Sequence, residues 1–179
     1  IKNNDRNEFN ENEIEFEEGK HSTERILNAD EVMKSPGINE KNELIKQIRA
    51  KGIDVISEIE FAYRYKGNSK IIAITGSNGK TTTTALTYHI CKTAGADCAM
   101  VGNIGFSFAK QVAVEPKQLY VAEISSFQLD DIKTFRPDVA VMTNITEDHL
   151  DRYDYKFENY ISSKYRVAMN QQHDDVFIY

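Results

Sequence analysis

Short apolar runs alternate with helical patterns along most of the 179-residue chain. Apolar runs of about four to eight residues between turn residues predict buried strands, whereas apolar positions spaced three and four apart predict helices. The strands expected on this basis span 14–16, 30–33, 54–56, 70–75, 98–101, 119–123, 138–143 and 176–179. Strands that alternate with helices predict an α/β fold, with a mostly parallel sheet covered on both faces.

The ends of the expected helices carry their own signals. The helix over 40–51 places its apolar residues on one face and stops at Gly52, a usual helix-ending residue. Ser57 and Glu60 have the spacing of a capping box, which opens a helix that continues through Tyr65. The two other expected helices span 80–94 and 155–167.

The two ends of the sequence suggest a piece of a longer enzyme. The stretch up to about Glu13 is rich in Asn and Glu, so it is either a disordered lead-in or part of an element whose partner is missing. The chain begins at Ile1 rather than Met, and no turn follows the last strand. We therefore expect the sequence to be a fragment of a longer enzyme.

A polar, glycine-containing stretch at 66–69 separates a helix from a new strand. Such stretches are typical of domain boundaries. We therefore expect the end of one α/β domain over residues 1–66 and the start of another over residues 67–179.

Composition excludes several classes of protein. With 40% hydrophobic and 28% charged residues the chain is neither collagen-like, coiled-coil nor mostly disordered. The net charge of −6 argues against a protein-wide footprint for nucleic acid. No apolar run or leader predicts a membrane span or a signal peptide, and Cys91 and Cys98 match no metal or disulfide spacing. We expect a cytoplasmic monomer without nucleic-acid or membrane partners.

The strongest chemical signal is an apolar strand, then Thr-Gly-Ser-Asn-Gly-Lys-Thr-Thr at 75–82, then a helix. Glycines let backbone amides face phosphate oxygens, and the helix N-terminus adds a favourable field. Lys80 would reach the β- and γ-phosphates of ATP, and the Thr81 hydroxyl would ligate Mg²⁺. The match to the general Walker pattern is incomplete because its first glycine falls at Ile74. A plain strand-to-helix turn with an exposed lysine is the weaker alternative. The residues expected to hold the nucleotide are Gly76, Ser77, Asn78, Gly79, Lys80, Thr81 and Thr82.

Ionisable residues follow two further strands. Glu123 ends one strand, and in an open parallel sheet that end faces the ligand crevice, where the carboxylate could approach Mg²⁺. After the next strand, His149 could ligate a metal while Asp148 orients the ring or a bound water. A solvated glutamate and a charged helix-capping loop are the alternatives. Taken alone, Lys164 is typical of a solvated helix lysine.

Together these motifs resemble the ATP-dependent Mur ligases of peptidoglycan synthesis. The segments that carry the resemblance are 75–82, Gly-Asn-Ile-Gly at 102–105, Glu-Ile-Ser-Ser-Phe-Gln-Leu at 123–129 and Thr-Asn-Ile-Thr-Glu-Asp-His-Leu-Asp-Arg-Tyr at 143–153. In this family the segment Thr-Gly-Ser-Asn-Gly-Lys-Thr replaces the general Walker spacing, so the lack of a glycine at position 74 does not argue against a phosphate loop. Ser-Ser-Phe-Gln-Leu resembles the branch that adds D-glutamate to UDP-N-acetylmuramoyl-L-alanine, as do 34–38 and 56–61, and the resemblance runs from about residue 14 to the end.

The resemblance implies a fold and a reaction. The fold would comprise part of a Rossmann-like UDP-binding domain, followed by part of a P-loop ATPase domain, and a C-terminal amino-acid-binding domain would be absent. The substrate carboxylate would attack the γ-phosphate of ATP to give an acyl phosphate and ADP. The amine of D-glutamate would then displace phosphate.

The resemblance also implies roles for individual residues. Thr81 and Glu123 would hold Mg²⁺ between the β- and γ-phosphates, and His149 would help hold a second Mg²⁺. Lys164 is the position that the family carbamylates, which would convert the cation into an anion able to ligate or orient around the metal. The expected catalytic residues are Lys80, Asp148, His149 and Lys164. The expected substrate-binding residues are Ser35, Pro36, Gly37, Asn103, Ser125 and Gln128.

Three alternatives remain open. The first is a sibling ligase that adds a different amino acid, or glutamate to folate, against which the pair Phe127-Gln128 argues. The second is a P-loop kinase or ATPase, which would need no UDP-sugar. The third concerns this piece alone, as a nucleotide-binding module without catalysis. Because the resemblance implies only part of the ATPase domain and no third domain, we expect these 179 residues alone not to turn over substrate.

Overall fold

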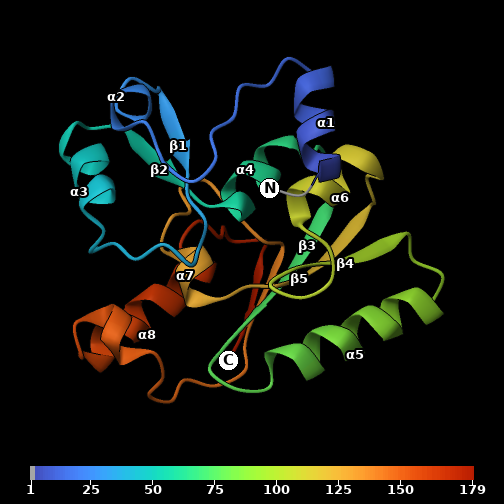
Figure 1. Ribbon diagram of the computed structural model, residues 1–179. Helices are drawn as coiled ribbons and strands as arrows, with labels where there is room; N and C mark the ends of the chain where they lie inside the picture. The colour runs from blue at the N-terminus through green and yellow to red at the C-terminus, as the bar shows by residue number, and fades with distance from the viewer. Residues whose placement is uncertain (1–2) are drawn as a thin grey trace.

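Two parallel sheets organise the computed structural model, which describes residues 3–179 (Figure 1). The small sheet pairs β1 (Glu31–Met33) with β2 (Asp54–Ile56). The large sheet contains β3 (Lys70–Thr75), β4 (Cys98–Gly102), β5 (Leu119–Glu123), β6 (Val139–Met142) and β7 (Val176–Ile178), in the order β4-β5-β3-β6-β7. Every pairing between these strands is parallel, which confirms the predicted α/β class.

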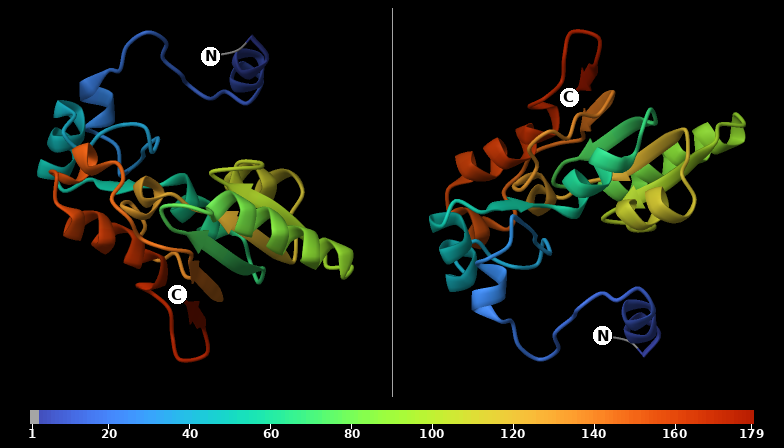
Figure 2. Two further views of the ribbon diagram at one scale, coloured as in Figure 1. Left: turned by 90° about the horizontal axis from the view of Figure 1, so that it is seen from below. Right: turned by 90° about the horizontal axis from the view of Figure 1, so that it is seen from above.

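Helices connect the strands and cover the large sheet. They are α1 (Asn3–Glu11), α2 (Thr23–Ile26), α3 (Glu43–Ala50), α4 (Glu58–Tyr65), α5 (Lys80–Thr93), α6 (Phe108–Val114), α7 (Ser126–Leu129) and α8 (Phe157–Tyr165), with 3₁₀ turns at Leu150–Tyr153 and Arg166–Ala168. Helix α5 lies along one face of the large sheet, whereas α4 and α6 lie on the other (Figure 2). The expected helices agree with these elements apart from their ends.

The main hydrophobic core lies between the large sheet and its α4–α6 face. Ile71 and Tyr120 of the sheet are fully buried there with Phe108 of α6. Helix α4 contributes Ile59 and Ala62 to the same core, although α4 precedes the boundary expected near residue 66. The division into 1–66 and 67–179 stays a prediction.

The capping box expected at the start of α4 is only half formed. The Ser57 hydroxyl accepts from the Glu60 amide at 3.3 Å. The Glu60 carboxylate instead accepts from the amides of Lys133, Thr134 and Phe135 at 2.8–2.9 Å. A fully buried carboxylate needs several donors, and the segment before β6 supplies them. Glu60 thereby anchors that segment to α4.

The N-terminal segment differs from its prediction. Residues 3–11, expected to be a disordered lead-in or part of an incomplete element, form α1, and residues 1–2 lie outside the described residues. The strand expected over 14–16 is wrong, because this segment has no regular structure and Ile14 is exposed. The side chains of Glu15 and Glu17 form ion pairs with Arg25. An isolated strand is unstable because its backbone N–H and C=O groups lack the hydrogen bonds of a neighbouring strand.

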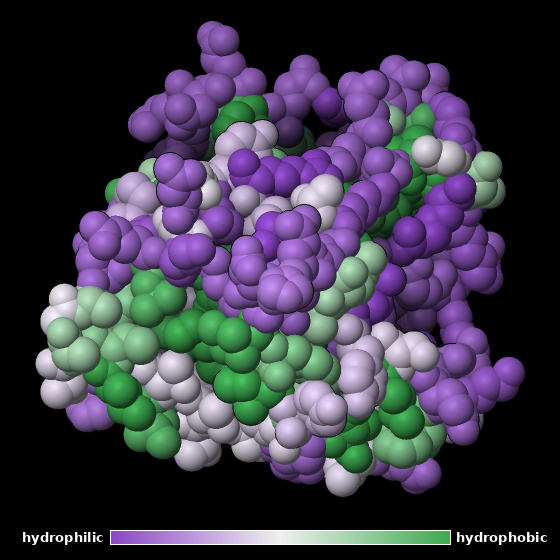
Figure 3. Space-filling view, turned by 180° about the vertical axis from the view of Figure 1, so that it is seen from behind, coloured by the Kyte–Doolittle hydropathy of each residue, from purple (hydrophilic) through white to green (hydrophobic). Residues whose placement is uncertain are grey.

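On the face seen from behind, apolar side chains gather across the lower left and centre, whereas the top and the right edge are mostly polar (Figure 3). The exposed large apolar side chains include Leu86 and Ile90 of α5 and Ile178 of β7. Among residues 3–179, no helix combines the length and the apolar composition that a membrane crossing requires.

Candidate functional site

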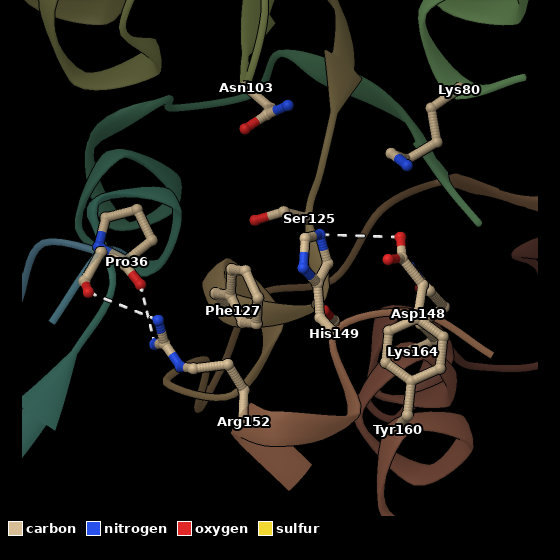
Figure 4. Close-up of a pocket in the computed structure, with 12 residues that line it drawn as sticks. Pro36, Lys80, Asn103, Ser125, Phe127, Asp148, His149, Arg152, Tyr160 and Lys164 are labelled. Atoms are coloured by element: carbon tan, nitrogen blue, oxygen red, sulfur yellow. Dashed lines mark hydrogen bonds and ion pairs between the residues drawn. The ribbon is translucent and has the colours of Figure 1, made fainter. Parts of the chain in front are cut away.

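Loops from both sheets meet around one pocket of about 330 Å³ at the carboxyl ends of the central strands (Figure 4). An open parallel sheet places its ligand crevice at this edge. The residues that line the pocket are Pro36, Gly37, Lys80, Asn103, Ser125, Ser126, Phe127, Asp148, His149, Arg152, Tyr160 and Lys164. The structure therefore brings all four expected catalytic residues to a single pocket.

The loop between β3 and α5 forms a cradle that fits phosphate. Gly76 has a φ of +143°, and a Cβ atom there would lie 2.0 Å from the Thr143 hydroxyl oxygen. Gly79 has a φ of +82° and is the residue before α5, which begins without a side-chain cap. The first-turn N–H groups of α5 and its positive dipole end can therefore serve an anion. This open helix end supports the expected binding of a nucleotide phosphate.

Ser77 and Asn78 fix the shape of this loop. The Ser77 hydroxyl donates to the Thr146 carbonyl at 2.8 Å and lies 3.1 Å from the Tyr160 hydroxyl. The Asn78 amide donates to the side-chain oxygen of Asn144 at 2.9 Å. The phosphate cradle is thus tied to the loop after β6, which carries Asp148 and His149.

Two lysines converge on the cradle. Lys80 Nζ donates to the carbonyls of Gly76 and Ser77 at 2.8 and 2.9 Å. Lys164 Nζ donates to the same Gly76 carbonyl at 2.7 Å, and only 2% of this residue is exposed. Burial lowers the pKa of the Lys164 amine to about 8, and the charge of Lys80 acts in the same direction. The fold therefore corrects the reading of Lys164 as a solvated lysine.

Thr81 and Glu123 present oxygen donors next to the cradle. The Thr81 hydroxyl donates to Glu123 Oε2 at 2.8 Å, and Asn103 Nδ2 donates to Glu123 Oε1 at 2.7 Å. The carboxylate is 1% exposed, and hydroxyl and carboxylate oxygens are the ligands that Mg²⁺ takes alongside water and phosphate. Within residues 3–179, no three His, Cys, Asp or Glu side chains form a metal cluster. The donor set fits an ion that is completed by nucleotide phosphates.

His149 lies at the mouth of the pocket in a left-handed backbone conformation, with a φ of +51°. Its Nε2 is 3.6 Å from Asp148 Oδ2, and its ring centroid is 5.2 Å from that of Phe127 (Figure 4). The side chain is 55% exposed. A half-exposed imidazole beside a carboxylate can meet a bound substrate or ion.

The expected substrate residues divide into two groups. Pro36, Gly37, Asn103 and Ser125 line the pocket, whereas Ser35 and Gln128 are not among its lining residues. The Gln128 side chain accepts from the Ser125 amide at 2.9 Å and completes the capping box of α7. The observed geometry gives Gln128 a structural task, and its contact with substrate stays a prediction.

Sequence reasoning assigned no role to Arg152 or Tyr160, which also line the pocket. Arg152 belongs to the dense run of ionisable residues that follows β6. That signal is visible in the sequence. The hydroxyl contact of Tyr160 with Ser77 depends on the packing of α8 against the phosphate loop and has no local signal.

Comparison with known proteins adds independent evidence. Residues 74–179 match the Mur ligase middle domain, and residues 1–44 match the MurD N-terminal domain. The UDP-N-acetylmuramoylalanine--D-glutamate ligase of Cytophaga hutchinsonii is 58% identical over 166 residues, which is 92% of this chain and 37% of the relative. That of Porphyromonas gingivalis is 52% identical over 172 residues, which is 96% of this chain and 38% of the relative. The chain thus spans under two-fifths of the length of these curated relatives.

Solved structures share the fold. The MurF ligase of Thermotoga maritima, in complex with ADP, superposes with a TM-score of 0.55 at 19% identity, over 85% of this chain and 45% of that one. A UDP-N-acetylmuramate:L-alanyl-γ-D-glutamyl-meso-diaminopimelate ligase from Neisseria meningitides superposes with a TM-score of 0.57 at 14% identity, over 99% and 60%. The model of the Mur ligase middle domain matches residues 74–179, which is more than half of the chain, and the chain therefore belongs to the Mur ligase family.

Proposed function

We propose that the protein containing this chain is an ATP-dependent ligase that joins D-glutamate to UDP-N-acetylmuramoyl-L-alanine, through an acyl phosphate, in peptidoglycan precursor synthesis. The observation that carries the reaction type is the position of Lys80, which donates to the Gly76 and Ser77 carbonyls beside an uncapped helix start. Attack by a carboxylate on a phosphoryl group brings two anions together and needs concentrated positive charge. The choice of D-glutamate and of the UDP substrate is supported by the names of relatives that are 52–58% identical.

The chain's own residues account for phosphate binding. Lys80 exchanges its two carbonyl partners for oxygens of the β- and γ-phosphates, and the first-turn amides of α5 bind the same groups. Thr81 and Glu123 would hold Mg²⁺ there, which lowers the charge that the attacking carboxylate meets. A substrate carboxylate oxygen then bonds to the γ-phosphorus as ADP leaves. In the second step the amine nitrogen of D-glutamate bonds to the acyl carbon, phosphate leaves, and the amine gives up a proton.

Carbamylation of Lys164 is part of the proposal. A buried amine with a lowered pKa has a larger neutral fraction than an ordinary lysine, and the neutral amine is the form that reacts with CO₂. The resulting carbamate would replace a second cation next to Lys80 with an anion. It would lie in the pocket with His149, where the two groups would help hold a second Mg²⁺.

The UDP substrate would enter from the side of the pocket that Pro36 and Gly37 form. Asn103 and Ser125, together with Ser35 and Gln128 around the rim, are the remaining candidate contacts of the proposal. We place the reaction in the cytoplasm, where ATP is available, and treat the protein as a monomer.

The test uses the full-length gene product and follows ADP release with Mg-ATP and UDP-N-acetylmuramoyl-L-alanine. D-glutamate, L-glutamate or no amino acid is added in parallel reactions. The proposal expects release that needs both the UDP substrate and D-glutamate and that is lost in Lys80→Ala. The matched control is Lys70→Ala, because Lys70 is a 72% exposed lysine at the opposite end of β3. ADP release that does not depend on D-glutamate would overturn the choice of amino acid. ADP release that does not depend on the UDP substrate would favour a kinase or ATPase.

A further inference from the structure

Arg152 connects three parts of the pocket that are distant in sequence. Its Nη2 donates to the carbonyls of Pro36 and Ile38 at 3.2 and 3.3 Å, and its Nη1 donates to that of Gly37 at 3.4 Å (Figure 4). The guanidinium carbon also lies 4.4 Å from the centroid of the Phe127 ring. The loop after β1, the start of α7 and the loop after β6 therefore meet at one side chain.

The chemistry of these contacts suits arginine in particular. A guanidinium is a planar fork of five N–H donors, so it can serve several carbonyls while its face stacks on an aromatic ring. Hydrogen bonds from a charged donor are stronger than those between neutral groups. The described contacts of Arg152 are carbonyls and a ring face, and they include no carboxylate. Arg152 also lines the pocket.

The loop that Arg152 holds is also fixed at its beginning. Lys34 precedes the loop, is 4% exposed, and its Nζ lies 3.0 Å from Asp131 Oδ2. Asp131 in turn receives Arg49 Nη2 at 2.6 Å. The first anchor is a buried ion cluster away from the pocket, whereas the second, at Arg152, is in the pocket itself. A ligand can therefore influence the second anchor and not the first.

The same side chain is coupled to His149. His149 lies three residues earlier, and its ring packs on Phe127, the ring that the Arg152 guanidinium covers. A displacement of the Pro36–Ile38 carbonyls would therefore act on the guanidinium and on the ring packing beside the imidazole. No other described residue joins these two loops through three backbone carbonyls.

We propose that Arg152 is a positioning residue, which couples the substrate wall at 36–38 to the loop that carries Asp148 and His149. The inference rests on the proposed function, since it concerns the site for the UDP substrate. Closing the wall on this substrate would place the catalytic loop for reaction, so that a change at Arg152 alters both substrate binding and turnover.

The test compares Arg152→Lys and Arg152→Met in the full-length protein. Arg136→Met is the matched control, because Arg136 pairs with Asp175 and does not line the pocket. Both Arg152 variants should raise the KM for the UDP substrate about tenfold and lower kcat by a similar factor, since carbonyl hydrogen bonds and the ring contact are lost. The KM for ATP should stay within about twofold. The control should change none of these values.

Two outcomes would overturn the proposal. If Arg152→Lys behaves like the unmodified protein while Arg152→Met is impaired, the charge acts directly on the substrate. If all kinetic constants are unchanged, or only the active fraction falls, Arg152 has no positioning role.

Amide hydrogen exchange gives a readout that needs no turnover. Arg152→Met should speed exchange in 34–38 and in 144–153 together, while the buried strand β3 keeps its protection. Acceleration in only one of the two loops would contradict the coupling. If the unmodified protein turns over without the UDP substrate, the proposed function is wrong. Hydrogen exchange would still show whether the two loops are coupled.

Discussion

The ammonium groups of Lys80 and Lys164 donate to one carbonyl oxygen, that of Gly76, at 2.8 and 2.7 Å. Two cations that share a neutral acceptor repel each other, and this repulsion adds to the effect of burial on the pKa of Lys164. The arrangement is costly in the free protein. It becomes favourable when anionic phosphate binds beside the two cations, or when carbamylation converts Lys164 into an anion next to Lys80.

Replacing Lys164 should make the protein more stable at neutral pH. The pKa of Lys164 is lowered from 10.5 to about 8, so the folded state binds this proton less tightly than the unfolded state does. The cost, roughly 3 kcal/mol, is fully present below about pH 8 and disappears as the pH rises toward 10.5. In CO₂-depleted buffer, Lys164→Met should therefore exceed the unmodified protein in its free energy of unfolding at pH 7.

Urea unfolding at several pH values checks this expectation. The stability advantage of Lys164→Met should shrink between pH 8 and 10. The comparison with the unmodified protein cancels the titration of the other lysines and tyrosines. An advantage that is constant over this range, or absent at pH 7, would show that Lys164 is not a destabilising buried cation.

Neutralising Glu123 should remove activity and leave the fold intact. Glu123→Gln keeps the shape of a side chain that accepts from Thr81 and Asn103, but it removes the charge that would help hold Mg²⁺. We expect a loss of about a hundredfold or more in kcat, with a higher Mg²⁺ requirement. Initial rates over a Mg²⁺ titration measure both, and exposed Glu115 provides the control Glu115→Gln. An unchanged Mg²⁺ dependence would argue against this site for the ion.

Alanine at the two loop glycines should have unequal effects. At Gly76 a Cβ would meet the Thr143 hydroxyl at 2.0 Å and the Asn144 backbone at 3.1 Å, whereas at Gly79 no atom lies within 4 Å. Gly79→Ala pays only for its positive φ, about 1–2 kcal/mol. Gly76→Ala should cost more and weaken nucleotide binding further, as thermal unfolding and ATP titration would measure. Equal effects would mean that the close approach to Thr143 does not matter.

Removing Asp131 should strongly destabilise the contact between α3, the loop after β1 and the central sheet. Asp131→Ala leaves buried Lys34 without this counter-ion, which typically costs about 3–5 kcal/mol. The double variant Lys34→Met with Asp131→Leu should recover much of that loss. Urea unfolding checks both, with exposed Asp174→Ala as the control. A small effect of Asp131→Ala alone would show that Glu40 suffices as the partner of Lys34.

The parts of the fold that local pattern determines were predictable. The strand at 70–75, its glycine loop and the helix after it are contiguous in sequence, so their order alone indicated the phosphate site. Glu123 could be placed because parallel strands bring their carboxyl ends to one edge. In each case the argument needed only neighbouring residues and the rules of a parallel sheet.

The parts that depend on distant packing were not predictable in this way. A lysine on a helix considered alone is expected to be solvated. Lys164 is buried because α8 packs beside the Gly76 carbonyl, which lies 88 residues earlier in the sequence. Glu60 has the spacing of a cap, yet the amides before β6 compete for its carboxylate. The run at 14–16 has strand-like residues but no partner strand. Long-range partners decide all three.

The most direct test of the central claim follows the oxygen atoms of the substrate. The full-length protein would turn over UDP-N-acetylmuramoyl-L-alanine carrying ¹⁸O in its terminal carboxylate, with Mg-ATP and D-glutamate, and the released phosphate would be analysed by mass spectrometry. An acyl-phosphate route transfers one carboxylate oxygen to phosphate, so each phosphate should carry a single ¹⁸O label. Phosphate released without label, at the same rate as peptide formation, would contradict the account.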